Sequence, residues 1–263
     1  MDIVDISLPS LAAGYLLLIL PLAILLYQRV HILKDVTIAV IRMTVQLLFV
    51  GFYLQIVFRY NNASLNLLWI LVMVTVADIS ILRGCKLSTK RFLLPVFAAL
   101  LVGTGIPVLV FVRPILQRES WLDAQYVIPL AGMVLGNCLR ADIIGLKNFY
   151  HAISVNRKAY HQSLAEGAKL SEALHPYFCD ALQAALLPTI SSMATIGLVA
   201  LPGMMTGVIL AGADPMTAIK YQIAIMIAIF TGTAVTVFSA IWLTIRSSFN
   251  GYGILKEDVL IDR

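Results

Sequence analysis

Long apolar runs alternate with short polar segments along most of the chain. A helix that crosses a membrane needs about 20 mostly apolar residues, and seven regions approach or exceed this length. These regions are residues 6–28, 36–58, 60–82, 92–112, 124–140, 187–211 and 221–245. The pattern predicts an all-α fold, a polytopic bundle of about seven membrane helices that forms one membrane-spanning domain over residues 1–263.

The sixth of these regions is expected to be broken. Residues 181–213 carry no charge over 33 positions, which is too long for one straight crossing. Pro202 and Gly203 interrupt the run. A broken helix frees backbone amides and carbonyls, which membrane proteins tolerate where the backbone lines a cavity. We therefore expect an interfacial lead-in followed by a broken span that faces a cavity.

The composition excludes an ordinary soluble domain. Hydrophobic residues make up 60% of the chain and charged residues 13%, whereas about a quarter of the residues in soluble domains are charged. In a soluble protein, the net charge of +5 would suggest a nucleic-acid partner. In a membrane protein, basic residues instead set the orientation. We therefore expect membrane lipid around this chain and no nucleic acid.

Lysine and arginine residues gather on one side of the predicted spans. Fourteen of the nineteen follow spans one, three, five and seven, four lie on the opposite side, and Arg42 lies inside a span. Cytoplasmic loops of membrane proteins are enriched in these residues. The distribution predicts an external N-terminus and a cytoplasmic C-terminus in the cell (inner) membrane.

The long polar segment at residues 140–180 follows the fifth span, on the predicted cytoplasmic side. Residues 155–180 have a helical pattern that Gly167 interrupts. Such a helix–Gly–helix element can lie on the membrane surface as an amphipathic hairpin, or it can dock onto a cytoplasmic partner. The residues themselves leave both interpretations open.

Four stretches of the sequence resemble known permeases. Residues 167–190, "GAKLSEALHPYFCDALQAALLPTI", resemble the cytoplasmic loop of ATP-binding-cassette permeases. Residues 127–137, "VIPLAGMVLGN", and 195–223, "TIGLVALPGMMTGVILAGADPMTAIKYQI", resemble the FetB-like family of iron-export permeases, to which plant aluminium-tolerance permeases are related. Residues 42–55, "RMTVQLLFVGFYLQ", resemble the second span of that family.

The resemblance implies a permease subunit of an exporter for iron or another metal, and not an enzyme. A separate cytoplasmic ATPase subunit would bind the ATP, so this chain would hold no cofactor. Two copies of each subunit, including a permease homodimer, would form the complex, and metal export would relieve oxidative stress. The family loop has a Glu five residues before its Gly, a position that Gln162 occupies here. By resemblance, the ATPase-coupling residues are Gln162, Glu166, Gly167 and Ala168.

Polar residues inside the predicted spans are candidates for a translocation path. Arg42 and Gln46 lie four residues apart and share one helix face. An arginine that faces lipid is unfavourable, so we expect Arg42 to face the bundle or to extend to the membrane surface. Asp78 lies near the inner end of its span and is expected to reach water or to pair with Arg42. Asn137 ends the fifth span, where it can contact cargo.

Two methionines follow the predicted break directly. Thioethers bind soft metals better than iron, and methionine is also a common apolar filler, so both roles stay open. No metal-ligand set is predicted, because the four histidines lack paired-ligand spacing within a span. The candidate path residues are Arg42, Gln46, Asn137, Pro202, Gly203, Met204 and Met205.

Two GxxxG motifs predict close helix packing. Gly132 and Gly136 form the first, and Gly203 and Gly207 form the second. Small residues at this spacing let helix backbones approach each other. The contacts can be ordinary packing within the bundle, or they can line the path or a dimer seam.

The sequence contains neither a P-loop motif nor another catalytic signature. The alternative to an ATP-driven permease is an ion-coupled secondary transporter. Such transporters usually have intramembrane carboxylates or repeat symmetry. Among the predicted spans only Asp78 qualifies, and no repeat is visible.

Overall fold

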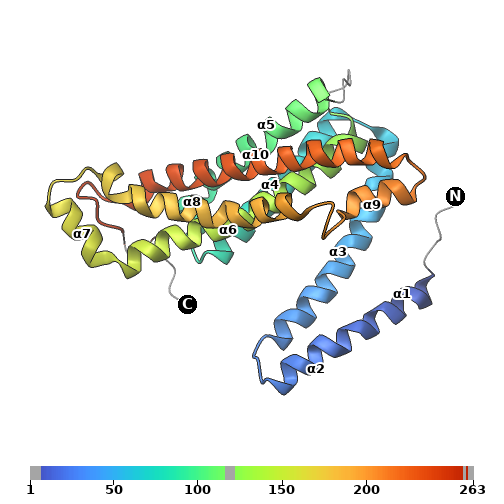
Figure 1. The fold of residues 1–263 in the computed structure, drawn as a ribbon, viewed down its shortest axis with the longest axis horizontal. Helices are drawn as coiled ribbons and strands as arrows, with labels where there is room; N and C mark the ends of the chain where they lie inside the picture. Colours follow the sequence, from blue (N-terminus) through green and yellow to red (C-terminus); the bar gives the residue numbers. More distant parts are fainter. Residues whose placement is uncertain (1–6, 116–121, 257–258, 260–263) are drawn as a thin grey trace.

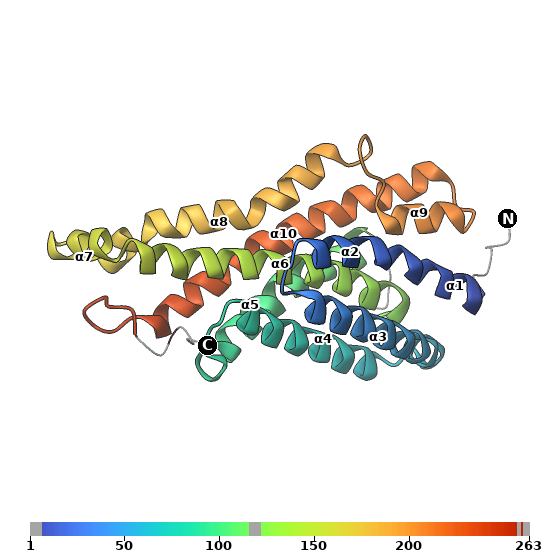
Figure 2. The same ribbon diagram turned by 90° about the horizontal axis from the view of Figure 1, so that it is seen from below.

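The computed structural model describes residues 7–115, 122–256 and 259. Over these residues the fold is all-α, as predicted, and the β contacts are two isolated bridges. The helices, shown in Figures 1 and 2, are α1 (Leu8–Gly14), η1 (Tyr15–Leu18), α2 (Ile19–Tyr27), α3 (Leu33–Tyr60), α4 (Ala63–Gly84), α5 (Thr89–Val110), η2 (Phe111–Ile115), α6 (Ala124–Val155), α7 (Arg157–Ala165), α8 (Leu170–Thr195), α9 (Gly203–Leu210) and α10 (Pro215–Ser248).

Short polar side chains start several of the long helices. Asn62 accepts a hydrogen bond from the Ser64 amide at the start of α4. Asp123 has the same role at the start of α6, and Asp214 at the start of α10. Such N-caps satisfy backbone amides that lack a partner in the first turn. The chain therefore enters each of these apolar helices at a position fixed by a capping residue.

Within the part of the chain that the structure describes, six helical segments are long and apolar enough to cross a membrane. They confirm a polytopic membrane bundle and correspond to six of the seven predicted spans. Their bounds are Pro9–Tyr27, Leu33–Tyr60, Ala63–Gly84, Thr89–Ile115, Ala124–Val155 and Pro215–Ser248. The orientation of the bundle stays a prediction.

The region predicted as the sixth span, residues 187–211, is divided between two helices. Helix α8 ends at Thr195, and α9 begins at Gly203. Pro202 lies just before α9 with an extended backbone, so the break occurs where the sequence placed it. The two helices follow one another along α10 (Figures 1 and 2). The residues before the break belong to one helix that begins at Leu170 and contains Pro176 and Pro188, and their place at the membrane interface stays a prediction.

Helix α6 extends further than predicted. The sequence placed the end of this span near residue 140, at the start of a polar loop, but the helix continues to Val155. Its last turns carry Leu146, Phe149, Tyr150 and Ile153, all buried, at helical spacing. This apolar face packs into the bundle while polar residues occupy the other face. The polar stretch is therefore largely helical.

Glycines allow the central helices to approach closely. A Cβ atom at Gly232 of α10 would lie 2.9 Å from the Gly103 carbonyl oxygen of α5 and 2.7 Å from Val134 Cγ1 of α6. A Cβ atom at Gly145 of α6 would lie 2.8 Å from Val237 Cγ1 of α10. These separations are too short for a side chain, so the glycines fix the crossings of α5, α6 and α10.

The predicted packing glycines behave differently. A Cβ atom at Gly132 would come 3.3 Å from the end of the Met73 side chain. Gly136 and Gly207 have open space where a Cβ would stand, as does Gly203. Within this chain, Gly136 and Gly207 therefore do not lie at the helix crossings, and the expectation that they line the path or a dimer seam stays a prediction.

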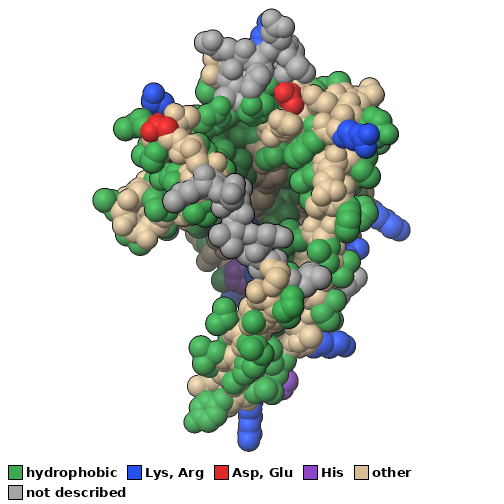
Figure 3. Space-filling view, turned by 90° about the vertical axis from the view of Figure 1, so that its right-hand side faces the viewer, with side chains coloured by type: hydrophobic (Ala, Val, Ile, Leu, Met, Phe, Trp, Pro, Cys, Tyr) green, Lys and Arg blue, Asp and Glu red, His purple; other side chains and the backbone are tan. Residues whose placement is uncertain are grey.

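Helices α1 to α3, residues 8–60, form an N-terminal arm that extends from the bundle (Figure 1). None of the most apolar stretches of its two long helical segments is buried. The arm joins the bundle near the end of α3, where Val57 packs with Ala124 and Ile128 of α6. There Tyr53 stacks on Trp69 of α4 at 4.0 Å between ring centres. Figure 3 shows hydrophobic side chains over much of the protruding part.

Candidate functional site

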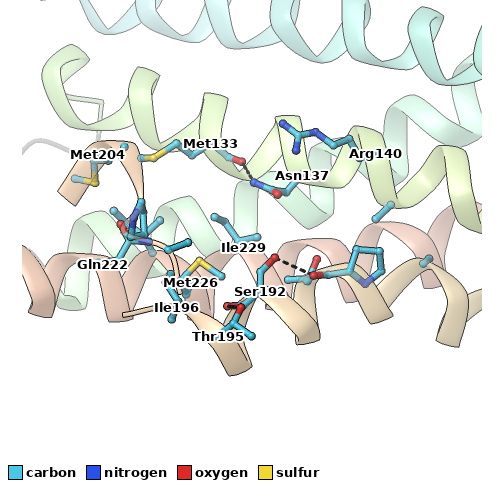
Figure 4. A pocket seen from close by; sticks show the side chains of 18 of the residues that line it. Met133, Asn137, Arg140, Ser192, Thr195, Ile196, Met204, Gln222, Met226 and Ile229 are labelled. Carbon is cyan, nitrogen blue, oxygen red and sulfur yellow. Dashed lines mark hydrogen bonds between the residues drawn. The ribbon is translucent and has the colours of Figure 1, made fainter. Parts of the chain in front are cut away.

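A cavity of about 510 Å³ lies among α6, α8, α9 and α10, two of which are membrane-length helices. Figure 4 shows side chains from these helices around it. Its polar side chains are Asn137, Arg140, Thr189, Ser192, Thr195 and Gln222. Most of the remaining lining is apolar, which is typical of a small-molecule site with a few placed polar groups.

The break between α8 and α9 forms part of the cavity wall. Helix α8 is followed by an extended residue, Ile196, and then by Gly197, which has a φ of +86°. This left-handed conformation favours glycine. The Gly197 amide donates to the Ala200 carbonyl, 2.9 Å away, and closes a tight turn. Ile196, Ala200 and Pro202 then line the cavity, so the irregular backbone faces a cavity, as the sequence predicts.

The cavity lining offers uncharged polar groups and one positive charge. Gln222 is buried, and its Oε1 has no hydrogen-bond partner in the described structure. The Asn137 Nδ2 donates to the Met133 carbonyl at 2.8 Å, which leaves its Oδ1 as an acceptor. Among the lining residues that the structure describes, Arg140 alone carries a full charge. The site therefore combines amide oxygens, hydroxyls and a guanidinium without a carboxylate.

Three methionines also line the cavity, namely Met133, Met204 and Met226 (Figure 4). Their thioethers are uncharged, soft ligands. Over the described residues, no group of three or more His, Cys, Asp and Glu side chains could hold a metal ion. The cavity has no conventional cage for a permanently bound metal, and its donors suit weak and transient contacts.

The structure brings four of the predicted path residues together. Asn137, Pro202, Gly203 and Met204 all line the cavity, although they come from α6, from the α8–α9 break and from the start of α9. Met205, the neighbour of Met204, is not part of the lining.

Arg42 and Gln46 lie elsewhere, on α3 of the N-terminal arm. They share one face, as predicted, and line a shallow surface depression with Asp35 and Met43. Both side chains are exposed within this chain. The structure therefore does not bring Arg42 and Gln46 to the cavity.

Asp78 also departs from expectation. Its side chain is fully buried and neither of its carboxyl oxygens has a hydrogen-bond partner among the described residues. It therefore neither reaches water nor pairs with Arg42, because α4 carries it into the bundle core while α3 runs outside.

Sequence reasoning missed several cavity residues. Gln222 is a single amide in the apolar run of α10, and such an isolated polar residue in a span is itself a signal of function. Arg140 was counted only among the orienting charges. Met133 and Met226 look like ordinary core residues, and only the three-dimensional arrangement distinguishes them.

The predicted helix–Gly–helix element is present as a hairpin of α7 and α8. Gly167 lies between the helices with φ of +94° and open space around its Cβ position. Gln162 Nε2 donates to Glu166 Oε1 at 2.9 Å across the last turn of α7. Gln162, Glu166 and Gly167 are exposed, and Ala168 is half-buried. The hairpin therefore presents three of the four predicted coupling residues at its surface.

The segment after α10 holds the hairpin in place. Tyr160 of α7 is buried, and its hydroxyl donates to the Gly253 carbonyl at 2.6 Å. Burial, with a smaller effect of Tyr177, raises the pKa of Tyr160 to about 12, so the phenol keeps its proton at neutral pH. The ring also packs against Phe249, which directly follows α10. The hairpin is thus attached to the end of a membrane-length helix.

Comparison with known proteins agrees with this architecture. Residues 8–249 match the family described as Uncharacterised protein family (UPF0014). The chain is 33% identical to the "Probable iron export permease protein FetB" of Escherichia coli (strain K12) over 94% of this chain and 93% of that protein. It is 34% identical to the "UPF0014 membrane protein YjkA" of Bacillus subtilis (strain 168), over 86% of this chain and 88% of the relative.

A plant relative shows the breadth of the family. The chain is 32% identical to "Protein ALUMINUM SENSITIVE 3" of Arabidopsis thaliana, over 81% of this chain and 77% of that protein. No solved structure matches the chain. The family match over nearly the whole length and the six membrane-length helices together establish that this chain is a multi-pass membrane protein of the UPF0014 family.

Proposed function

We propose that this UPF0014 membrane protein is the permease subunit of an ATP-binding-cassette exporter that moves iron or another metal out of the cytoplasm. The observation that carries the proposal is the 33% identity to the probable iron export permease of Escherichia coli, over 94% of this chain. The cavity between α6, α8, α9 and α10 is the proposed cargo site. Its uncharged ligand groups, which are amide oxygens, hydroxyls and thioethers, would bind a metal ion weakly. Weak binding suits a site that must release its cargo.

The ATPase would be a separate cytoplasmic subunit that binds the nucleotide. Its proposed docking element is the turn between α7 and α8, with Gln162, Glu166, Gly167 and Ala168. A push on this turn would reach α10 through the Tyr160–Gly253 hydrogen bond and the Phe249 contact. Nucleotide binding would then favour one of two arrangements of the helices, since a ligand shifts a conformational equilibrium only by its differential affinity.

A complex with two permeases and two ATPases is part of the proposal. The N-terminal arm supports a permease homodimer, because α3 leaves many large apolar side chains uncovered by its own chain. Arg42 and Gln46 lie on this arm. An arginine on a lipid-facing helix is costly, and a second copy would give it polar neighbours.

Purification of the tagged chain from its native membranes tests the assembly. We expect a soluble ATPase with a Walker motif to accompany it in equal amount. The two subunits would then be placed in vesicles that contain a fluorescent iron chelator, with the ATPase sites facing outward. ATP-dependent quenching is the expected result. If no ATPase subunit accompanies the chain even after cross-linking, the proposal is contradicted. If the complex hydrolyses ATP but moves no metal, the proposed metal cargo is contradicted.

An ion-coupled secondary transporter is the second candidate. The observation in its favour is that α6 adds a second buried carboxylate, Asp142, to Asp78 of α4. The same vesicles without ATPase separate the two candidates. Uptake driven by an imposed pH gradient alone would support secondary transport, whereas uptake that requires ATP supports the exporter.

A further inference from the structure

Two carboxylic acid side chains are buried in the core of the bundle, away from the cavity lining. Asp78 comes from α4 and Asp142 from α6, and each has an exposed fraction of 0%. Their helices, α4 and α6, pack against each other, and the Asp78 charge acts on Asp142. Ala141, the residue before Asp142, lines the cavity, but Asp142 points to another side of α6 and is not part of the lining.

Neither carboxyl has a compensating partner. All four oxygens lack a hydrogen bond among the described residues. Thr236 of α10 lies beside Asp142, but its hydroxyl hydrogen-bonds to carbonyls of its own helix, 3.0 Å from Gly232 O and 3.2 Å from Thr233 O. The Thr236 hydroxyl is therefore a donor near Asp142 that is shared with carbonyls of its own helix.

Other titratable groups near the pair do not neutralise it. The thiols of Cys138 and Cys85 are buried and interact with Asp142. Lys147 acts on Cys85, but its own side chain is exposed. Thr104 of α5 contributes a buried hydroxyl that has no partner and interacts with Cys138. The cluster is thus polar and unsatisfied, with two potential negative charges, and the buried residues that the structure describes include no Lys, Arg or His to offset them.

Close packing restricts what can bind between α5, α6 and α10. The Gly103–Gly232 and Gly145–Val237 contacts bring α5, α6 and α10 together without room for a Cβ. The described residues also provide no group of three strong metal ligands. A metal ion with its coordination shell needs space and further ligands, whereas a proton needs neither. Two ionised carboxylates would be strongly unfavourable in such a site.

We infer that Asp78 and Asp142 form a proton-binding site in the membrane domain. In the packed arrangement at least one of the two buried carboxyls holds a proton, and because the charge of one acts on the other, the two groups titrate as a pair. If α4 and α6 separate during a conformational cycle, water enters and accepts the proton, which leaves a carboxylate. The inference goes beyond the proposed function, since it depends on neither the ATPase nor the cargo.

Infrared difference spectroscopy of the purified full-length chain in detergent tests this directly. The difference is taken between the protein in H₂O and the protein in D₂O, both at neutral pH. We expect it to show the carbonyl stretch of a protonated carboxylic acid, shifted by the exchange. The double variant Asp78→Asn with Asp142→Asn should lose this band and remain folded, because a carboxamide resembles a neutral carboxylic acid. Asp180→Asn is the matched control, since Asp180 is exposed on α8, and it should keep the band.

Each outcome decides the inference. A band in the wild type and in the control that is lost in the double variant supports the proton site. A wild type without the band at neutral pH overturns it, as does a band that persists in the double variant. A metal ion that copurifies in equal amount, or loss of the band on addition of Mn²⁺, also overturns it in favour of a cation site. If the double variant fails to fold, Asp78→Asn alone should change the intensity or position of the wild-type band, and an unchanged band overturns the inference.

Discussion

The Tyr160 hydroxyl donates a 2.6 Å hydrogen bond to the Gly253 carbonyl, across 93 residues of sequence. Tyr160 belongs to the short helix α7, and Gly253 lies in the segment that follows α10. Both residues are buried. A Cβ at Gly253 would also lie 3.0 Å from Leu164 Cδ1 of α7. The α7–α8 hairpin is therefore attached to the end of α10 by a specific polar contact and by close packing.

Tyr160→Phe should weaken the transmission of movement from the hairpin while the hairpin still forms. The variant leaves the buried Gly253 carbonyl without its donor, a loss of about 1–3 kcal/mol, but keeps the ring that packs on Phe249. We expect more ATP to be hydrolysed for each metal ion transported. Tyr177→Phe is the control, because Tyr177 contacts the Tyr160 ring from its edge. An equal ratio of ATP to metal in the two variants would contradict the role of this bond.

Gly167→Pro should abolish stimulation of the ATPase by the permease. Proline fixes φ near −65°, which is incompatible with the φ of +94° at Gly167. The turn should therefore change shape while the membrane helices stay folded, since no neighbouring atom lies at the Cβ position. ATP hydrolysis in the reconstituted complex is the measurement, and Gly207→Ala, at another open glycine, is the control. Normal stimulation by Gly167→Pro would exclude this turn from the docking surface.

Gly232→Ala should destabilise the bundle. A methyl group there would overlap Val134 and the Gly103 carbonyl, and such overpacking costs about 1–3 kcal/mol. Gly136→Ala places the same methyl group into open space and should be neutral. Thermal denaturation of the two variants in detergent compares them. Equal melting temperatures would show that α5, α6 and α10 can separate slightly without loss of stability.

The Gly232 and Gly136 comparison also shows where sequence reasoning succeeded and where it stopped. Apolar runs of membrane length determined the fold class, because spanning helices satisfy their own backbone hydrogen bonds. Pro202 and the glycines around it located the break in the sixth region. The GxxxG spacing, however, says which residues share a helix face and not which face meets another helix. In the structure, α5, α6 and α10 cross at Gly103, Gly145 and Gly232, which lie outside the motifs.

The candidate site was predictable only in part for the same reason. Asn137 and Met204 were identified because they lie at the end of a span and next to a helix break. Gln222 completes the cavity from a third helix, and no local pattern links α10 to those positions. Asp142 was missed because the sequence placed it in a polar loop, whereas the apolar face of α6 continues the helix past it. Long-range packing decides both cases.

Met204 and Met205 provide a test of the cavity as the cargo site. They are neighbours of the same type, both half-buried, but only Met204 lines the cavity. Met204→Ala should change ATP-dependent metal flux, and loss of a contact worth about 1 kcal/mol corresponds to roughly a fivefold change in affinity. Met205→Ala removes the same number of atoms outside the cavity and should leave the flux near that of the wild type. Flux measured over a range of metal concentrations separates an effect on affinity from one on protein amount. If Met205→Ala has the larger effect, the cargo follows a different path from the cavity between α6 and α10.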